Sequence, residues 1–250
     1  MFLHKKTKAK EKQDEKVKGK ISMKKFAAMF LTMVMTTAAL TGCGGAAEAP
    51  AEDTAAERTT FTVGFDAEFP PYGYMDDNGE YVGFDLSLAQ EVCDRNGWEL
   101  VKQPINWDTK DMELSSGAID CIWNGFTING REEEYTWSVP YVDNSQVIVV
   151  AEDSGIATFA DLAGKKVGVQ TGTTGDIYAS DDSSIGSVEQ YNSGTEAALA
   201  LSQGKIDAVI IDNEPAKKYI EKYEGLVIID EEYTFEEYAM CIAKGNDELT

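Results

Sequence analysis

Two successive series of alternating strand and helix patterns constrain the fold of this chain more than any other feature. From residue 60, short apolar or alternating runs typical of strands are separated by runs with helical periodicity, and from about residue 158 the alternation begins again. Strands that are joined through helices pair in parallel, because each crossover returns the chain to the same end of the sheet. Two series of about 85 residues each therefore predict two α/β lobes, each a mostly parallel sheet flanked by helices.

The periodicity and the turn residues also give the bounds of the expected elements. In the first series we expect strands at 60–65, 98–103, 119–124 and 146–150, a helix at 85–96 and a short helix after Trp107. In the second series we expect strands at 166–169, 188–191, 208–211 and 226–229, with helices at 158–162, 171–179, 195–203 and 213–222. Asp77-Asn78-Gly79 predicts a hairpin turn. A last strand is expected at 238–243.

Two crossings between the lobes are expected, near 141–145 and near 234–238. They assign residues 60–143 and 239–250 to the first lobe and residues 144–238 to the second lobe. Two crossing segments form a hinge, and two lobes that are joined by a hinge form a cleft.

The amino end has the pattern of an export signal. Met23-Lys24-Lys25 is followed by an apolar run at 26–40, which is too short to span a membrane comfortably. The run ends in Leu40-Thr41-Gly42-Cys43, which resembles a bacterial lipobox. We therefore expect an amino-terminal extension and signal peptide at 1–42, a lipid such as palmitate on Cys43, and a flexible tether at 43–59.

This interpretation places the protein on the outer face of the cytoplasmic membrane, held there by the lipid on Cys43. A signal peptide with a chance cysteine is the alternative. Met23 is one candidate for the true start, and an extended positive region before the apolar run is the other.

The charge of the chain excludes several kinds of partner. The sequence has 22 Lys+Arg and 44 Asp+Glu, and ten of the lysines lie in residues 1–42, which hold only three acidic residues. From Cys43 onward this leaves 12 basic and 41 acidic residues, a net charge of −29. Such a surface repels nucleic acids and anionic membranes, so we expect no nucleic-acid partner.

Histidine and cysteine usage limits the chemistry further. The single histidine, His4, lies in the segment that processing is expected to remove, which leaves neither a histidine base nor a histidine metal ligand. We therefore expect no metal and no cofactor. Cys93, Cys121 and Cys241 lie in apolar stretches and are expected to be buried free thiols, with a Cys121–Cys241 disulfide as the alternative.

The stretch 122–131 combines an apolar run with a turn of small and polar residues. A strand that ends there presents the backbone and side chains of Asn124, Gly125 and Thr127 at the carboxyl edge of its sheet, where open α/β sheets bind ligands. Arg131 adds a planar guanidinium whose geometry suits a carboxylate.

Other strand ends are expected to face the same cleft. Asp212 follows the strand at 208–211 and can accept hydrogen bonds from an ammonium group. The N–H groups at 172–174 lie at a helix start, where anions bind. Asp66 ends the first strand, and Phe69 and Trp107 offer flat apolar walls. A guanidinium fork and a carboxylate that lie about the width of one amino acid residue apart in space fit an α-amino acid zwitterion.

Each of these positions also has an ordinary structural explanation, which stays open. Arg131 could pair with the acidic run at 132–134, and Asp212 could cap the following helix. Trp107 could be a core residue, Asp66 a turn residue, and 170–173 an ordinary strand–helix turn.

Five motifs together resemble the family 3 extracellular solute-binding proteins, the polar amino acid receptors of ABC importers. They are DAEFPPY at 66–72, GFDL at 83–86, GFT at 125–127 followed by Arg131, QTGT at 170–173 and DAVIID at 207–212. The resemblance runs from about residue 60 to the end of the chain. It implies a two-lobed, periplasmic-binding-protein-like (type II) fold with the ligand in the cleft between the lobes.

The resemblance also implies a role for each site residue. Arg131 would bind the ligand α-carboxylate with the backbone of Thr173 and Thr174. Asp212 would bind the α-ammonium with Gly125 and Thr127. The remaining expected ligand contacts surround the side chain of the ligand: Asp66 at its polar end, Phe69 and Trp107 on its flat sides, and Asn124 and Gln170 nearby.

Three departures from the family pattern stand out. Ser87 replaces a usual acidic residue, and the segment from Thr127 to Arg131 is one residue shorter than in many members. Members also continue beyond the segment that resembles 244–249, so we expect this chain to be truncated, with a first lobe that lacks part of its cover.

These features predict a monomeric, lipid-anchored binding protein that captures a polar amino acid and delivers it to an ABC permease. It is not expected to be an enzyme. The alternative is a cyclohexadienyl (prephenate or arogenate) dehydratase on the same fold, with Asp66 or Glu68 as the acid, and a sensor domain is a third possibility. The negative field disfavours glutamate and aspartate, while arginine, lysine, glutamine and cystine remain candidates.

Overall fold

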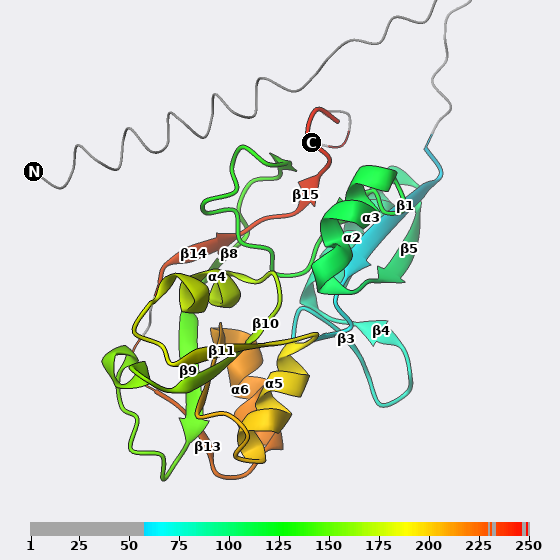
Figure 1. Ribbon diagram of the computed structural model, residues 1–250. Coiled ribbons are helices and arrows are strands. Elements are labelled where there is room, and N and C mark those ends of the chain that lie inside the picture. Colours follow the sequence, from blue (N-terminus) through cyan, green and yellow to red (C-terminus); the bar gives the residue numbers. More distant parts are fainter. Residues whose placement is uncertain (1–57, 230, 232–233, 247–248, 250) are drawn as a thin grey trace, which may run out of the picture. The chain divides into compact units, whose positions relative to one another are not determined.

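The computed structural model describes residues 58–229, 231, 234–246 and 249 (Figure 1). The predicted signal peptide, the lipid site Cys43 and the tether up to residue 57 lie outside the described residues. The fold that follows is that of the remaining part of the chain.

The first five-stranded sheet has a parallel core that is extended by antiparallel strands. Its spatial order is β5 (Glu99–Pro104), β1 (Thr60–Phe65), β6 (Cys121–Ile122), β15 (Cys241–Ile242) and β7 (Thr136–Trp137). Strand β1 pairs in parallel with β5 and β6, and β15 pairs antiparallel with β6 and β7. The carboxyl ends of β1 and β6 therefore lie at one edge of this sheet.

Helices pack on both faces of the first sheet because its strands are apolar on both sides. Helix α2 (Phe84–Asn96) packs against Phe61, Val63 and Phe65, which alternate along β1. The opposite face carries the 3₁₀ helix η1 (Trp107–Thr109) and helix α3 (Lys110–Ser116), whose Leu114 packs against Ile122. Helix α2 ends at Gly97, whose φ of 71° is the left-handed conformation that favours glycine.

The second five-stranded sheet repeats this plan. Its spatial order is β11 (Ser187–Tyr191), β10 (Lys166–Gln170), β12 (Ala208–Asp212), β9 (Gln146–Ala151) and β13 (Leu226–Ile228). Strand β10 is parallel to β11 and β12, and β9 is antiparallel to β12 and β13. The carboxyl ends of β10 and β12 lie at the same edge.

Strand β9 shows how the second sheet is covered on both faces. Val147 and Val149 pack against α5 (Gly194–Ser202) and α6 (Asn213–Lys222), while Ile148 and Val150 pack toward α4 (Thr174–Asp181) and η2 (Phe159–Leu162). Burying each of these side chains contributes about 1.5–3 kcal/mol to folding. The continuous apolar run is thus explained by burial on two sides.

A short antiparallel pair accompanies the two chain crossings between the sheets. Strand β8 (Val142–Asn144) lies between β7 and β9 in the sequence, and β14 (Glu236–Tyr238) lies between β13 and β15. The two strands pair directly, with Glu236 opposite Asn144. A three-stranded sheet of β2 (Glu68–Phe69), β3 (Gly73–Met75) and β4 (Tyr81–Val82) completes the described strands. The lobe and hinge bounds given above stay a prediction.

The two-lobed α/β prediction is confirmed, and individual elements differ from it in length. The strand expected at 119–124 is only Cys121–Ile122, because the chain leaves the sheet at Trp123. The strand expected at 238–243 is divided between β14 and β15, which pair with different sheets. The helix expected at 158–162 is a 3₁₀ turn, and α4 starts only at Thr174. Strands β2, β7 and β8 were not predicted.

The structure also bears on the cysteines and on membrane insertion. Cys93, Cys121 and Cys241 are free and buried, so the alternative of a Cys121–Cys241 disulfide is wrong for this structure. Burial raises the pKa of the Cys121 thiol well above its usual value, which makes it unreactive. Within the described residues, no helix combines the length and the apolar character needed to cross a bilayer.

Candidate functional site

The loop after β6 brings several predicted residues to the carboxyl edge of the first sheet. Gly125 has a φ of 56°, and a Cβ there would lie 2.8 Å from Phe69, so only glycine fits without strain. The buried carboxylate of Asp85 accepts the Gly125 N–H at 2.7 Å and the Tyr141 hydroxyl at 2.8 Å. Burial raises the pKa of Asp85 to about 7. Asp85, on helix α2, therefore fixes the backbone of this loop at Gly125.

Arg131 lies in this loop with most of its guanidinium surface covered. Its Nη1 donates to the Thr127 carbonyl at 3.1 Å and to the Thr174 hydroxyl at 3.4 Å. The guanidinium carbon lies 5.2 Å from the centre of the Phe126 ring. Arg131 forms no ion pair with the described acidic residues, so the alternative that it pairs with 132–134 is wrong. Among the described residues, the Nε and Nη2 donors have no hydrogen-bond partner.

The turn before α4 adds a helix N-terminus from the second sheet. Thr173 is the N-cap of α4, and its hydroxyl accepts the Asp176 N–H at 3.3 Å and donates to the Gln170 carbonyl at 2.8 Å. Gly172 has a φ of 74°, and its N–H donates to Asp176 at 2.9 Å. The backbone at Thr174 thus lies at a helix N-terminus, where an anion is stabilised.

Asp212 lies at the end of β12 and occupies the N-cap position of α6, but its side chain makes no capping hydrogen bond there. Its Oδ1 accepts hydrogen bonds from Asn144 at 2.6 Å, Gln146 at 2.9 Å and the Tyr238 hydroxyl at 2.5 Å. Burial, and then repulsion by Glu236, raises the pKa of Asp212 to about 7. The side chain therefore does not cap α6, and the carboxylate belongs to a buried polar network.

Asp66, directly after β1, is a further buried acid of the site. The carboxylate accepts the Gln170 side-chain amide at 2.6 Å and the Glu68 N–H at 2.8 Å, and its own N–H donates to Asn124 at 3.0 Å. Only 7 % of Asp66 is exposed, and burial raises the pKa of its carboxyl. The described residues offer Asp66 neutral donors but no cation.

The aromatic residues are part core and part pocket wall. Trp107 is 6 % exposed and meets Phe126 edge to face, with ring centroids 5.3 Å apart. Phe69 stacks on Tyr72 at 5.8 Å. Both Phe69 and Trp107 nevertheless contribute surface to the pocket, so core packing and a binding role are compatible.

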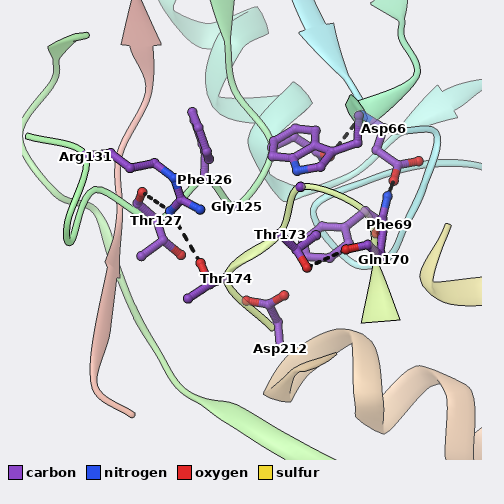
Figure 2. Close-up of a pocket in the computed structure, with 13 residues that line it drawn as sticks. Asp66, Phe69, Gly125, Phe126, Thr127, Arg131, Gln170, Thr173, Thr174 and Asp212 are labelled. Atoms are coloured by element: carbon purple, nitrogen blue, oxygen red, sulfur yellow. Dashed lines mark hydrogen bonds between the residues drawn. The ribbon is translucent and has the colours of Figure 1, made fainter. Parts of the chain in front are cut away.

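One pocket with an empty volume of about 330 Å³, including the space open at its mouth, brings these residues together (Figure 2). The eleven predicted ligand contacts all line it: Asp66, Phe69, Trp107, Asn124, Gly125, Thr127, Arg131, Gln170, Thr173, Thr174 and Asp212. Their individual contacts with a ligand stay predictions.

Sequence reasoning missed part of the surroundings. Phe126 also lines the pocket, although it lies inside the recognised motif GFT. Gly172, which was expected at the cleft through its N–H group, lines the pocket as well. Asn144, Gln146 and Glu236 support Asp212, and nothing in their local sequence indicates this role. Their assignment needs the pairing of β8 with β14.

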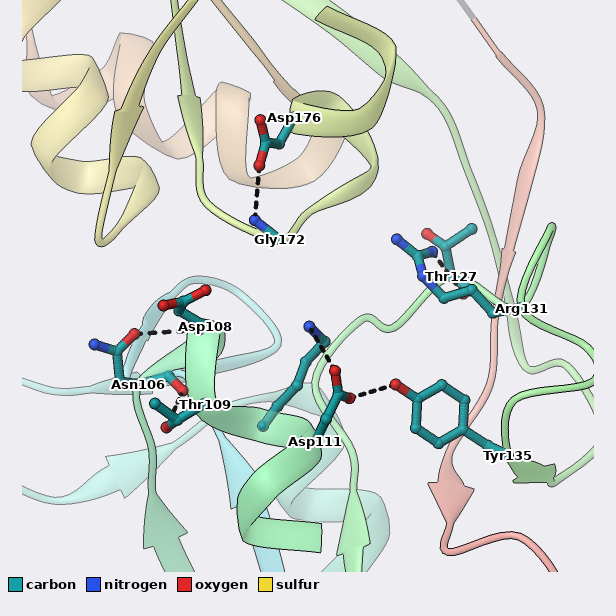
Figure 3. Close-up of polar contacts among 10 residues, drawn as sticks. Asn106, Asp108, Thr109, Asp111, Thr127, Arg131, Tyr135, Gly172 and Asp176 are labelled. Atoms are coloured by element: carbon teal, nitrogen blue, oxygen red, sulfur yellow. Dashed lines mark hydrogen bonds and ion pairs between the residues drawn. The ribbon is translucent and has the colours of Figure 1, made fainter. Parts of the chain in front are cut away.

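Lys110 was also missed, because a lysine on a short helix is normally solvated. It is only 6 % exposed, and its ammonium lies 5.5 Å and 5.7 Å from the ring centres of Trp107 and Phe126. Its nearest carboxylate is Asp111 at 3.9 Å, which also accepts a hydrogen bond from Tyr135 (Figure 3). Burial lowers the pKa of Lys110. A buried cation therefore lies beside the pocket.

Comparisons with known proteins identify the family. Residues 61–250 match the bacterial extracellular solute-binding proteins, family 3. The chain belongs to this family. It is 32% identical over 197 residues to the L-cystine-binding protein TcyJ of Escherichia coli (strain K12), covering 77% of this chain and 74% of that protein.

Solved structures of arginine-binding proteins are similar in fold and sequence. The arginine-bound form of truncated ArgBP from T. maritima has a TM-score of 0.73 and 39% identity, and the match covers 76% of this chain and 91% of that one. An ancestral arginine-binding protein bound to glutamine has a TM-score of 0.73 and 37% identity, with 77% and 87% covered. The protein is therefore an amino-acid-binding receptor of the ABC transporter class, and the dehydratase alternative is not supported.

Proposed function

We propose that this receptor binds an amino acid with a cationic side chain, L-arginine above all. The observation that carries the proposal is the buried Asp66 carboxylate, which lines the same pocket as Arg131 and Asp212 but has only neutral hydrogen-bond donors. Arg131 would bind the α-carboxylate of the ligand, and Asp212 would bind its α-ammonium. Asp66 then remains for the end of the side chain.

Electrostatics favours a cation at Asp66. A carboxylate buried without an opposite charge is costly, and a ligand guanidinium or ammonium offsets that cost. A ligand carboxylate would instead face Asp66 directly and be repelled, which disfavours glutamate and aspartate. Because a guanidinium is planar and weakly hydrated, it fits between the Phe69 and Trp107 rings better than a lysine ammonium does.

The relatives support the same ligand class without fixing it. Several are named arginine-binding, whereas TcyJ is named cystine-binding and the ancestral protein was solved with glutamine. Glutamine and cystine therefore remain the comparison ligands. In each case the head group would occupy Arg131, Thr173, Thr174, Asp212, Gly125 and Thr127, and the side chain would lie near Asn124 and Gln170.

We also propose how the receptor works in the cell. The lipid on Cys43 would hold it on the outer face of the cytoplasmic membrane as a monomer. Closure of the lobe formed by 144–238 on the lobe formed by 60–143 and 239–250 would follow ligand binding, because some contacts form only in the closed state. The closed form would then engage an ABC permease. No catalytic step and no cofactor are part of this function.

Isothermal calorimetry with the twenty amino acids, ornithine and cystine tests the proposal. L-Arginine should bind most tightly, and Asp66→Asn should weaken L-arginine at least tenfold while it changes L-glutamine less than threefold. The matched control is Glu68→Gln, two residues away and exposed. Equal loss for both ligands, or a preference for a neutral or acidic amino acid in the unmodified protein, would refute the role of Asp66.

A further inference from the structure

Asp212 has a second buried carboxylate beside it, that of Glu236 on β14. Asn144 donates from the same amide nitrogen to Asp212 at 2.6 Å and to Glu236 at 3.1 Å. Gln146 does the same, at 2.9 Å and 3.3 Å. Each amide thereby uses both of its N–H bonds to join the two acids. Asp212 and Glu236, called here the acid pair, are thus held close together.

The acid pair is almost fully buried. Glu236 has no exposed surface and Asp212 has 6 %. The Oε1 atom of Glu236 accepts the Thr234 hydroxyl at 2.9 Å. Its Oε2 atom, which accepts both amides, also accepts the Thr127 hydroxyl at 2.9 Å. Hydrogen bonds of this number position both carboxylates firmly, but all of their donors are neutral.

The charges that surround the acid pair do not neutralise it. Neither acid forms an ion pair in the part of the chain that the structure describes. The other titratable groups near Asp212 are the hydroxyls of Tyr238, Tyr72 and Tyr219. Burial, together with the negative charge of Asp212, raises the pKa of all three, so they stay neutral. The Arg131 guanidinium donates hydrogen bonds to the Thr127 carbonyl and the Thr174 hydroxyl rather than to either acid.

Two carboxylates that share donors at such close range cannot both be charged cheaply in a buried site. We propose that the acid pair holds one proton while the pocket is empty and gives it to the solvent when the α-ammonium of an amino acid binds. The ligand cation then supplies the positive charge that the proton supplied before. Amino acid capture would be coupled to proton release, with Glu236 as a positioning residue that acts through Asp212.

The raised pKa of Asp212 supports this inference, because Glu236 is one of its causes. An ammonium beside Asp212 would lower that pKa again. At pH values between the pKa of the occupied protein and that of the empty protein, the empty protein therefore binds more protons. Affinity must then rise with pH through this range and level off above it. The inference rests on the proposed role of Asp212 as the ammonium acceptor.

Calorimetry of L-arginine binding in phosphate and in Bis-Tris buffer measures the number of protons released, because both buffer near pH 6 and differ in ionisation enthalpy. At pH 6 the unmodified protein should release roughly one proton per ligand, and its affinity should rise about tenfold per unit between pH 5 and pH 7. Glu236→Gln should reduce proton release at pH 6 by about half or more and flatten the rise in affinity. Asp66, whose pKa is also raised, contributes equally to both proteins.

A ligand comparison keeps the test decisive if Glu236→Gln does not fold. 5-Guanidinopentanoate has the carboxylate and guanidinium of arginine but no α-ammonium, so it should release fewer protons than L-arginine from the unmodified protein. Equal release by the two ligands, or equal release by the protein and its variant, would overturn the acid pair. Absence of binding by every amino acid would overturn the proposed function itself, whereas binding without proton release overturns only this inference.

Discussion

Two buried aspartates at helix starts, Asp85 and Asp212, have nearly the same environment but different positions. Asp85 lies in the first turn of α2 and Asp212 directly before α6, and each accepts a tyrosine hydroxyl. Burial raises the pKa of each to about 7. Only Asp212 lines the pocket, whereas Asp85 accepts the N–H of Gly125 behind it. A raised pKa therefore shows only that a carboxyl group is buried. Exposure of the group to the pocket is what marks it as a candidate ligand contact.

Asp212→Asn should have the largest effect on binding. Removing one partner of a buried charge contact costs roughly 2–5 kcal/mol, so the affinity for L-arginine should fall by about a hundredfold or more. Calorimetry measures this change, and Glu214→Gln, an acid two residues along the chain, is the matched control. An affinity within fivefold of the unmodified protein would remove Asp212 from the site.

Asp85→Ala should instead reduce stability. It leaves the Gly125 N–H and the Tyr141 hydroxyl buried without an acceptor, which costs roughly 2–4 kcal/mol of unfolding free energy. Urea titration of the ligand-free protein measures the loss, with the exposed Asp94→Ala as control. If Asp85→Ala lost ligand affinity but no stability, the distinction between the two aspartates would be wrong.

The pH dependence of stability tests what the two aspartates share. Their pKa values are higher in the folded protein than the usual 3.8, so the folded state binds more protons between about pH 4 and pH 7. The unfolding free energy should thus fall as the pH rises from 5 to 8, by on the order of a few kcal/mol. Thermal melts of the ligand-free protein measure this fall. Asp85→Asn should reduce it, and a melting temperature that rises over this range would contradict the burial of uncompensated acids.

Lys110→Met should have the smallest effect. The Lys110 ammonium attracts the ligand carboxylate but repels the side chain of a cationic ligand, so the affinity for L-arginine should change less than about fivefold. Stability should hold or increase, because a buried charge is replaced by an apolar side chain of similar length. The exposed Lys218→Met is the control for titration and melting. A loss beyond twentyfold would show that Lys110 contacts the ligand directly.

The sequence predicted elements best where local periodicity and the tertiary structure agree. Helix α6 has the predicted bounds Asn213–Lys222, because proline in its first turn and its amphipathic pattern are both local signals. The division of 238–243 into β14 and β15 could not be predicted, since Tyr238 pairs with Val142 and Cys241 with Trp137. Such partners depend on how the two sheets are joined.

The same limit applies to the pocket. Residues in recognisable motifs, such as Arg131 and Asp212, were predicted to lie together, and they line one pocket. Glu236 was not predicted, because it follows a run of acidic residues that resembles a solvated surface. Lys110 was missed for a similar reason. The local sequence of a charged residue does not show whether it is buried.

The separation of Arg131, Asp212 and Asp66 around one pocket has a consequence for the stereochemistry of the ligand. The α-carbon of an amino acid bears a carboxylate, an ammonium and a side chain, and the proposed roles assign a different protein group to each. Three unlike contacts at fixed positions define a handedness, so the mirror-image ligand can satisfy at most two of them. The pocket would therefore select one enantiomer, and titration with D-arginine in place of L-arginine would measure how rigidly the three points are held.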